Sequence, residues 1–268
     1  MYKVTSFKEI IQDTEPWHRL RKTPGQLNSS SICKYLGGRC RDTPERKNYG
    51  KWTKVTQYRE RIHGGIEHPP EEVSGFLRGI FEEGNEGERR VKGIYSGILE
   101  ETPYYIVESE RCSLRVGVSP DSCLDIGVDG VECKIPVEIK TQTIGKDWYM
   151  PPLKYQYQLL WQCIALGVND GIILRLCRDE TIQKWRFRWD IQAYYEAFEN
   201  FYMSMDDEGG DKTRLCSYDL FHLHAYRVPW KDNGVIKYFD YNICTVDDAI
   251  LNMSLLKKLG MENFNVEL

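Results

Sequence analysis

The chain has 268 residues, of which 41% are hydrophobic and 12% aromatic, and its formal net charge at pH 7 is −4. This length allows one large globular core. No stretch approaches the roughly 18 uninterrupted apolar residues of a membrane helix, and residues 1–13 lack the apolar core of a signal peptide. The nine cysteines include no Cys-x-x-Cys pair, which argues against a zinc module or a disulfide scaffold. We therefore expect an intracellular protein, neither secreted nor inserted in a membrane.

Charge is distributed unevenly near the N-terminus. From Trp17 to Arg61 there are twelve Lys or Arg and three acidic residues, whereas residues 64–110 hold eleven Glu and four basic residues. The basic segment also contains several aromatic rings: Trp17, Tyr35, Tyr49, Trp52 and Tyr58. Such a segment can contact phosphates and stack on bases, although a solvated basic face has the same composition.

The first predicted elements are helical. A short helix precedes the turn at Pro24-Gly25, and a second helix begins near Ser29-Ser30-Ser31, whose hydroxyls can cap free amide groups. Residues 72–95 predict one long helix with an apolar stripe at a 3.6-residue period, formed by Leu77, Ile80, Phe81, Val91 and Tyr95. Glu88 falls in the middle of this stripe. A carboxylate aimed at a core needs a partner such as Arg111 or Arg115, or a metal, because burying an unpaired charge is costly.

Strands follow over residues 104–107 and 113–118, and Asp129-Gly130 then predicts a two-residue hairpin turn. Directly opposed residues of that hairpin have numbers that sum to 259, so Asp121 faces Glu138. Period 2 places Lys140 on the same face and directs Ile139 into a core. Pro136 cannot donate to the ladder, which implies an edge position or a bulge and leaves a register shifted by one residue open.

Two carboxylates and an ammonium on one sheet face suggest a metal site. Opposed like charges destabilise a ladder, and a divalent cation would remove that penalty. Mg²⁺ prefers oxygen ligands, commonly one or two carboxylates with water and phosphate oxygens. Lys140 could orient an attacking water or stabilise charge on a phosphate. The alternative is a surface hairpin with a cross-strand charge cluster.

The remaining elements complete the predicted fold. A helix over residues 154–166 ends at Gly167, and one of its faces carries Tyr155, Gln158, Leu159 and Gln162. Strands over 172–177 and 184–189 and a helix over 191–205 follow. The order helix, strand, hairpin, helix, strands, helix predicts an α/β or α+β fold with a mixed central β-sheet flanked by helices.

Several motifs occur in an order that resembles the PD-(D/E)XK nuclease superfamily, and within it the phage lambda exonuclease and YqaJ-like viral recombinase branch. They are Trp17-His18-Arg19-Leu20-Arg21, Gly84-Asn85-Glu86-Gly87-Glu88, Ser119-Pro120-Asp121, Glu138-Ile139-Lys140 and Gln158, nine residues before Gly167. Gln156 is the alternative glutamine. The family usually has Gly after the Asp, where this chain has Ser122, and residues 216–268 have no counterpart in the pattern.

The resemblance implies a restriction-endonuclease-like core. Residues 1–215 would form the nuclease domain with its basic N-terminal segment, and residues 216–268 an extension packed on it. Asp121, Glu138 and the carbonyl of Ile139 would bind Mg²⁺, for which Mn²⁺ could substitute, and Lys140 would assist the attacking water. Glu88 would orient water or a second metal, and Gln158 would steady Lys140 or the nucleophile.

The resemblance also implies a pocket for a DNA 5′ phosphate. Its residues would be Arg21, Ser30, Ser119 and Lys146, with Ser29 and Ser31 as alternatives to Ser30. Lys146 lies where the relative has an arginine, and a lysine pairs with phosphate as a point charge without the bidentate fork. Trp17 would contact the DNA end.

The resulting hypothesis is a Mg²⁺-dependent exonuclease that degrades double-stranded DNA in the 5′ to 3′ direction from a 5′-phosphorylated linear end. It would serve viral-type recombination or genome processing, in the host cytoplasm or nucleus. By resemblance, its partners would be a single-strand annealing protein and further copies of itself in a trimer. The alternatives are an endonuclease acting on RNA or structured DNA, and a catalytically silent nucleic-acid-binding protein.

Overall fold

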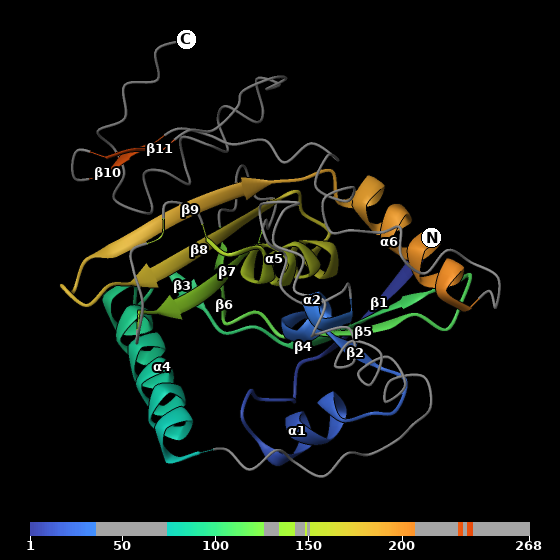
Figure 1. Ribbon diagram of the computed structural model, residues 1–268, viewed down its shortest axis with the longest axis horizontal. Coiled ribbons are helices and arrows are strands. Elements are labelled where there is room, and N and C mark those ends of the chain that lie inside the picture. Colours follow the sequence, from blue (N-terminus) through green and yellow to red (C-terminus); the bar gives the residue numbers. More distant parts are fainter. Residues whose placement is uncertain are drawn as a thin grey trace.

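The computed structural model describes residues 1–35, 74–125, 134–142, 148, 151–206, 230–232 and 235–237 (Figure 1). A five-stranded sheet has the order β3 (Leu99–Glu100), β6 (Ser122–Asp125), β7 (Lys134–Thr141), β8 (Asp170–Leu176) and β9 (Ile182–Arg188). Its β7–β8 pair is parallel and its other pairs are antiparallel. The predicted mixed sheet is therefore confirmed.

A second, four-stranded sheet has the order β1 (Tyr2–Phe7), β4 (Tyr104–Ser109), β5 (Arg115–Val118) and β2 (Leu27–Asn28). The sequence analysis predicted β4 and β5 but not β1, which pairs antiparallel with β4 along its whole length. A separate antiparallel pair joins β10 (Trp230–Asp232) and β11 (Val235–Lys237). These six residues are all that is described beyond residue 206, so the division at residue 215 stays a prediction.

Helices flank the sheets. The N-terminal part contains α1 (Glu15–Arg21), a 3₁₀ turn η1 (Ser29–Ser31) and α2 (Ile32–Tyr35). The longer helices are α4 (Gly75–Ile94), α5 (Leu153–Leu166) and α6 (Ile191–Asp206), close to their predicted bounds. Gly167 ends α5 with a φ of 68°, a left-handed conformation that suits glycine. No helix in the described part of the chain is long and apolar enough to cross a membrane.

Two apolar clusters lie on the two faces of the five-stranded sheet. On one face, α5 packs between the sheets and α6, and Trp161 of α5 contacts Tyr195 and Phe198 of α6 edge to face. On the other face, Val91 of α4 packs against β6, β7 and β8. Ile139 belongs to this second cluster and is buried, as predicted. Alternation along β7 consequently directs Glu138 toward the face covered by α5.

The register of the β6–β7 pair is the predicted one. Ser122 faces Val137 and Asp125 faces Lys134, so the numbers sum to 259 in each pair. The Asp129-Gly130 turn itself lies outside the described residues. Pro136 lies in a central strand rather than at an edge, but pairing between β7 and β8 begins only at Val137. Because Pro136 lies before the first β7–β8 pair, the lack of an amide hydrogen at Pro136 removes no hydrogen bond from that parallel ladder, and the register does not shift.

The predicted apolar stripe of α4 is only partly correct. The side chain of Val91 is fully buried, but Phe81 is 57% exposed to solvent. The helix meets the sheet from its middle onward, where the carbonyl of Gly84 accepts a hydrogen bond from the Thr141 hydroxyl and a side chain at Gly87 would collide with Thr141. The first half extends past the sheet (Figure 1), so the sheet cannot cover its apolar side chains.

Candidate active site

Asp121 and Glu138 come together at the junction of β6 and β7. Asp121 directly precedes β6, and its Oδ2 accepts a hydrogen bond of 2.7 Å from the amide of Ile139. The side chain of Asp121 thus continues the contact with β7 beyond the last backbone pair. Glu138 lies in the central strand and is fully buried, and Asp121 is 7% exposed. Backbone pairing ends at Ser122 and Val137, and the same register continued by one residue sets Asp121 opposite Glu138.

The ammonium of Lys140 is held by three oxygens. Its Nζ lies 3.5 Å from Oδ2 of Asp121, forms an ion pair with Oε1 of Glu138 and donates a 2.9 Å hydrogen bond to the carbonyl of Ile139. Burial by itself lowers the pKa of Lys140, but the charges of Asp121 and Glu138 outweigh burial and raise it above its ordinary value. These are the three atoms that the resemblance implies as metal ligands, and they converge on one cation.

Glu138 is the most perturbed carboxyl group of the cluster. Burial, followed by the charge of Asp121, raises the pKa of Glu138 to about 8, while Lys140 and a hydrogen bond from Gln162 oppose the increase. A buried carboxylate with a raised pKa beside a second carboxylate is typical of functional sites. A positive charge that stays next to Glu138 stabilises its ionised form.

The donor set fits a hard divalent cation. Among the described residues, no three His, Cys, Asp or Glu side chains gather as a metal-binding group. A metal at this position would therefore have two carboxylates and one main-chain carbonyl as protein ligands, with its remaining positions open to water and phosphate. Mg²⁺ is commonly bound in this way. In the structure the Lys140 ammonium contacts these same oxygens.

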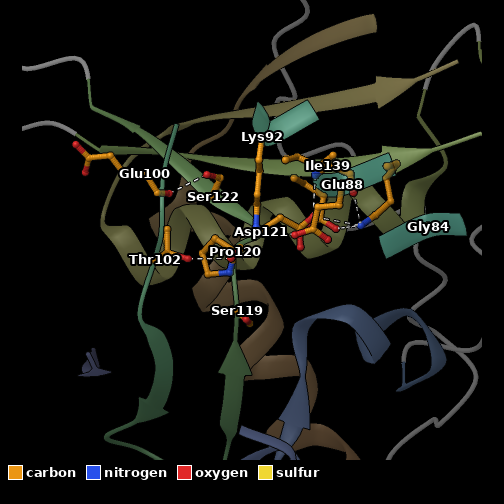
Figure 2. A network of polar contacts seen from close by, with 12 residues as sticks. Gly84, Glu88, Lys92, Glu100, Thr102, Ser119, Pro120, Asp121, Ser122 and Ile139 are labelled. Atoms are coloured by element: carbon orange, nitrogen blue, oxygen red, sulfur yellow. Dashed lines mark hydrogen bonds and ion pairs between the residues drawn. The ribbon is translucent and has the colours of Figure 1, made fainter. Parts of the chain in front are cut away.

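Glu88 reaches the cluster from α4. It lies beside Asp121 (Figure 2), and its Oε1 forms a 2.7 Å ion pair with Nζ of Lys92, one helical turn further on. Burial and the charge of Asp121 raise the pKa of Glu88, and Lys92 and then Lys140 oppose this shift. The sequence analysis did not identify Lys92 as the partner of Glu88.

The two arginines considered as partners of Glu88 pair elsewhere: Arg111 with Glu199, and Arg115 with Glu108. The close contact of Gly84 and Gly87 with Thr141 holds α4 against the end of β7 and so brings Glu88 to the site. The positioning of Glu88 thus depends on these two glycines together with the buried side chain of Val91.

The glutamine that contacts the carboxylates is Gln162 rather than Gln158 or Gln156. Gln162 is fully buried in α5, and its Nε2 donates a 2.5 Å hydrogen bond to Oε2 of Glu138. Gln158 lies one turn earlier and is half-buried, and Gln156 donates instead to the carbonyl of Pro151. The sequence offered one indication that Gln162 could take this role, because Gln162 shares a helical face with Gln158. The same face brings the Tyr155 ring to 5.2 Å from Nζ of Lys140.

The residues implied for the phosphate pocket are joined by direct contacts. Arg21 donates a 2.8 Å hydrogen bond to Oγ of Ser30, and its guanidinium lies 4.3 Å from the ring centroid of Trp17. Nε1 of Trp17 donates a 3.2 Å hydrogen bond to Oγ of Ser119. Ser30 is exposed whereas Ser29 is buried, which favours Ser30 over that alternative. Lys146 lies outside the described residues.

Trp17 has a different environment from the one predicted. Its ring is 7% exposed and packs with Tyr104 and Ile106, so little of it is available to a base at a DNA end. This burial argues against direct contact between the ring and DNA. Trp17 instead stacks on Arg21 and donates to Ser119, two of the residues implied for the pocket.

No protein-family model matches the sequence. No curated protein matches it either. Among solved structures, the chain is similar to the alkaline exonuclease LHK-Exo from Laribacter hongkongensis, at 17% identity over 78% of this chain and 96% of that chain, with a TM-score of 0.42. The same enzyme in complex with dAMP gives 16% identity, equal coverage and a TM-score of 0.43. Similarity of this degree transfers no activity, so function has to be argued from the site residues.

Proposed function

We propose that this protein is a metal-dependent nuclease that hydrolyses double-stranded DNA from a 5′-phosphorylated end. The observation that carries the proposal is the convergence of Asp121, Glu138 and the Ile139 carbonyl on one cation. Two buried carboxylates beside a main-chain oxygen suit Mg²⁺, with Mn²⁺ as a substitute. Glu88 adds a third carboxylate at the edge of the same site.

The residues divide the work of phosphodiester hydrolysis. Asp121, Glu138 and the Ile139 carbonyl would hold the cation, which supplies positive charge to the phosphate when bound. Lys140, displaced from these oxygens but still next to them, would donate hydrogen bonds to the attacking water or to a phosphate oxygen. Glu88 would accept a hydrogen bond from that water on the side of α4.

End recognition would come from Arg21, Ser30 and Ser119. The hydroxyl of Ser30 accepts a hydrogen bond from Arg21 and that of Ser119 accepts one from Trp17, so each hydroxyl directs its own hydrogen elsewhere. Two hydroxyl hydrogens and a guanidinium are suitable donors for a terminal phosphate. Occupation of this pocket would make the enzyme an exonuclease with 5′ to 3′ polarity.

The test is a cleavage assay on linear duplexes that differ only in the presence of a 5′ phosphate, with Mg²⁺, Mn²⁺ or EDTA. Wild-type protein should degrade the phosphorylated duplex faster and only with metal, and Lys140→Met should be inactive. Lys134→Met is the matched control, because it removes a lysine from the same strand at a surface ion pair with Glu100. Digestion in EDTA, or full activity of Lys140→Met, would refute the proposed site.

Further substrates test the alternatives. Cleavage of closed circular DNA or of RNA would indicate an endonuclease instead of an exonuclease, and duplex binding without cleavage would indicate a catalytically silent nucleic-acid-binding protein. If Arg21→Ala leaves the preference for a 5′ phosphate unchanged, the pocket assignment fails.

We extend the proposal by resemblance to a role in viral recombination with a single-strand annealing protein. We also extend it to a trimeric assembly, which light scattering of the purified protein would test.

A further inference from the structure

Gln162 of α5 lies between the two groups of residues that the proposed function uses. Its Nε2 donates to Oε2 of Glu138 at 2.5 Å and to the carbonyl of Ser119 at 3.4 Å. The Ser119 hydroxyl accepts from Nε1 of Trp17, whose ring stacks on the guanidinium of Arg21. An uninterrupted series of contacts therefore connects the phosphate pocket to the buried carboxylate.

The orientation of the Gln162 amide is determined by these neighbours. Rotating the amide by half a turn would place Oε1 against the carboxylate of Glu138 and against the carbonyl of Ser119, both of which are acceptors. Nε2 must therefore face them. Oε1 is buried and has no hydrogen-bond partner among the described residues. A buried oxygen without a partner is uncommon and costs stability, so the contacts of Nε2 are the ones that account for this side chain.

Ser119 also belongs to the segment that leads into Asp121. The carbonyl of Pro120 accepts a 2.8 Å hydrogen bond from Thr102, and Asp121 accepts from the Ile139 amide (Figure 2). The backbone between the pocket and the cation site is thus anchored on both sides. A shift of Ser119 would be transmitted to β7 through Gln162.

We infer that Gln162 is a positioning residue through which a 5′ phosphate bound at Arg21 and Ser119 orients Glu138 for the reaction. This inference rests on the proposed function. A phosphate that binds the Ser119 hydroxyl also fixes the position of the Ser119 carbonyl. The carbonyl then aligns the Gln162 amide, which keeps its hydrogen bond to Oε2 of Glu138. Oε1 of Glu138 then remains directed at the cation. Phosphorylated ends are consequently turned over faster, in addition to being bound more tightly.

The coupling is reciprocal, because two sites linked through one element influence each other equally in binding. Inorganic phosphate should therefore lower the Mg²⁺ concentration at the midpoint of a thermal-stability titration of the wild-type protein. In Gln162→Met, which keeps the length of the side chain but not its donors, phosphate should leave the Mg²⁺ midpoint unchanged. This readout does not depend on catalysis.

The kinetic test compares kcat and KM on duplexes with and without a 5′ phosphate. For Gln162→Met we expect kcat on the phosphorylated duplex to fall by about 10- to 100-fold, the range for residues that orient metal ligands. The ratio of kcat values between the two ends should approach 1, while the ratio of KM values persists. A smaller folded fraction cancels in these ratios. Gln162→Asn, too short to reach both acceptors, should behave in the same way.

Gln192→Met is the matched control. Gln192 donates a 2.7 Å hydrogen bond to Glu196 on the exposed surface of α6, so the same exchange removes the same kind of bond away from the site. Its kcat ratio should equal that of wild type. The coupling between the 5′ phosphate and Glu138 is refuted if both Gln162 variants keep the wild-type kcat ratio, or if that ratio is 1 in the wild-type protein. Neither result would refute the proposed nuclease function. If wild type cleaves neither duplex, the proposed function and the coupling fall together.

Discussion

Removing the ammonium of Lys140 tests the cation site without any assumption about the substrate. In Lys140→Met, Asp121 and Glu138 remain together in the interior with no cation between them. Breaking a buried ion pair by removing one partner costs about 3–5 kcal/mol. For a chain of this size, each kcal/mol shifts Tm by about 2–4 °C, so Tm in EDTA should fall by about 6–20 °C. Protonation of Glu138, whose pKa is already about 8, favours the lower part of this range at pH 7.

A divalent cation should replace the missing charge. Ligand binding to the folded state at about 100 times Kd adds about 2.7 kcal/mol of stability, so saturating Mg²⁺ should restore much of the lost Tm. The wild-type protein should gain less, because Mg²⁺ must first displace the Lys140 ammonium from the same oxygens. The variant should therefore bind Mg²⁺ more tightly than wild type and still fail to cleave DNA.

The assay is thermal unfolding with Mg²⁺ and with EDTA, supported by calorimetric titration of Mg²⁺. Lys134→Met serves as the control, since its surface ion pair with Glu100 contributes only about 0–1 kcal/mol and lies outside the site. An equal Mg²⁺-induced rise in Tm for Lys140→Met, Lys134→Met and wild type would refute the reasoning. An unchanged Tm of Lys140→Met in EDTA would refute it as well.

Three further outcomes are expected. In denaturant titrations, Gly87→Ala should destabilise the protein by about 1–3 kcal/mol because the new methyl group collides with Thr141. Adding Thr141→Ala to this variant should recover part of the loss. The control Gly79→Ala, whose methyl group would enter open space on the same helix, should instead stabilise the protein by about 0.5–1 kcal/mol. Burial and a neighbouring carboxylate raise the pKa of Glu88 above 4.5, so the stability from this group is complete below pH 4.5 and lost as pH rises through the folded pKa. Glu88→Gln should accordingly raise Tm in EDTA more at pH 8 than at pH 4, and an equal change at both would contradict the shift. Arg21→Lys should reduce the preference for 5′-phosphorylated duplexes by about 10-fold, because an ammonium lacks the guanidinium fork, and an unchanged preference would exclude Arg21 from the pocket.

Local patterns in the sequence predicted the β6–β7 strand pair of the candidate site with little error. The Asp-Gly turn signal set the register that the structure shows, and period 2 assigned Glu138 and Ile139 to opposite faces of β7. Glu88 was singled out from its position on one helix, and its carboxyl group interacts with Asp121 in the structure, while its role in a reaction stays a prediction. These predictions succeeded because each depends on geometry within a single element or a single hairpin.

Errors arose where two elements meet. Helical periodicity grouped Gln158 and Gln162 on one face, but the rotation of α5 against β7 decides that Gln162 reaches Glu138. Phe81 belongs to the apolar stripe of α4 and is exposed nonetheless, because α4 meets the sheet only from about Gly84 to Val91. The burial of Trp17 likewise depends on β4, which is more than 80 residues away in the chain.

The sequence alone determined which chemical groups are present and how they are ordered within each strand and helix. Spacing along the backbone sets those relations, since the rise and rotation per residue are nearly constant. Tertiary structure decided which groups touch: the ammonium of Lys140 on three oxygens, Lys92 beside Glu88, and Gln162 between Ser119 and Glu138. Such contacts depend on how elements shift and rotate against one another during core packing, and no local period encodes that arrangement.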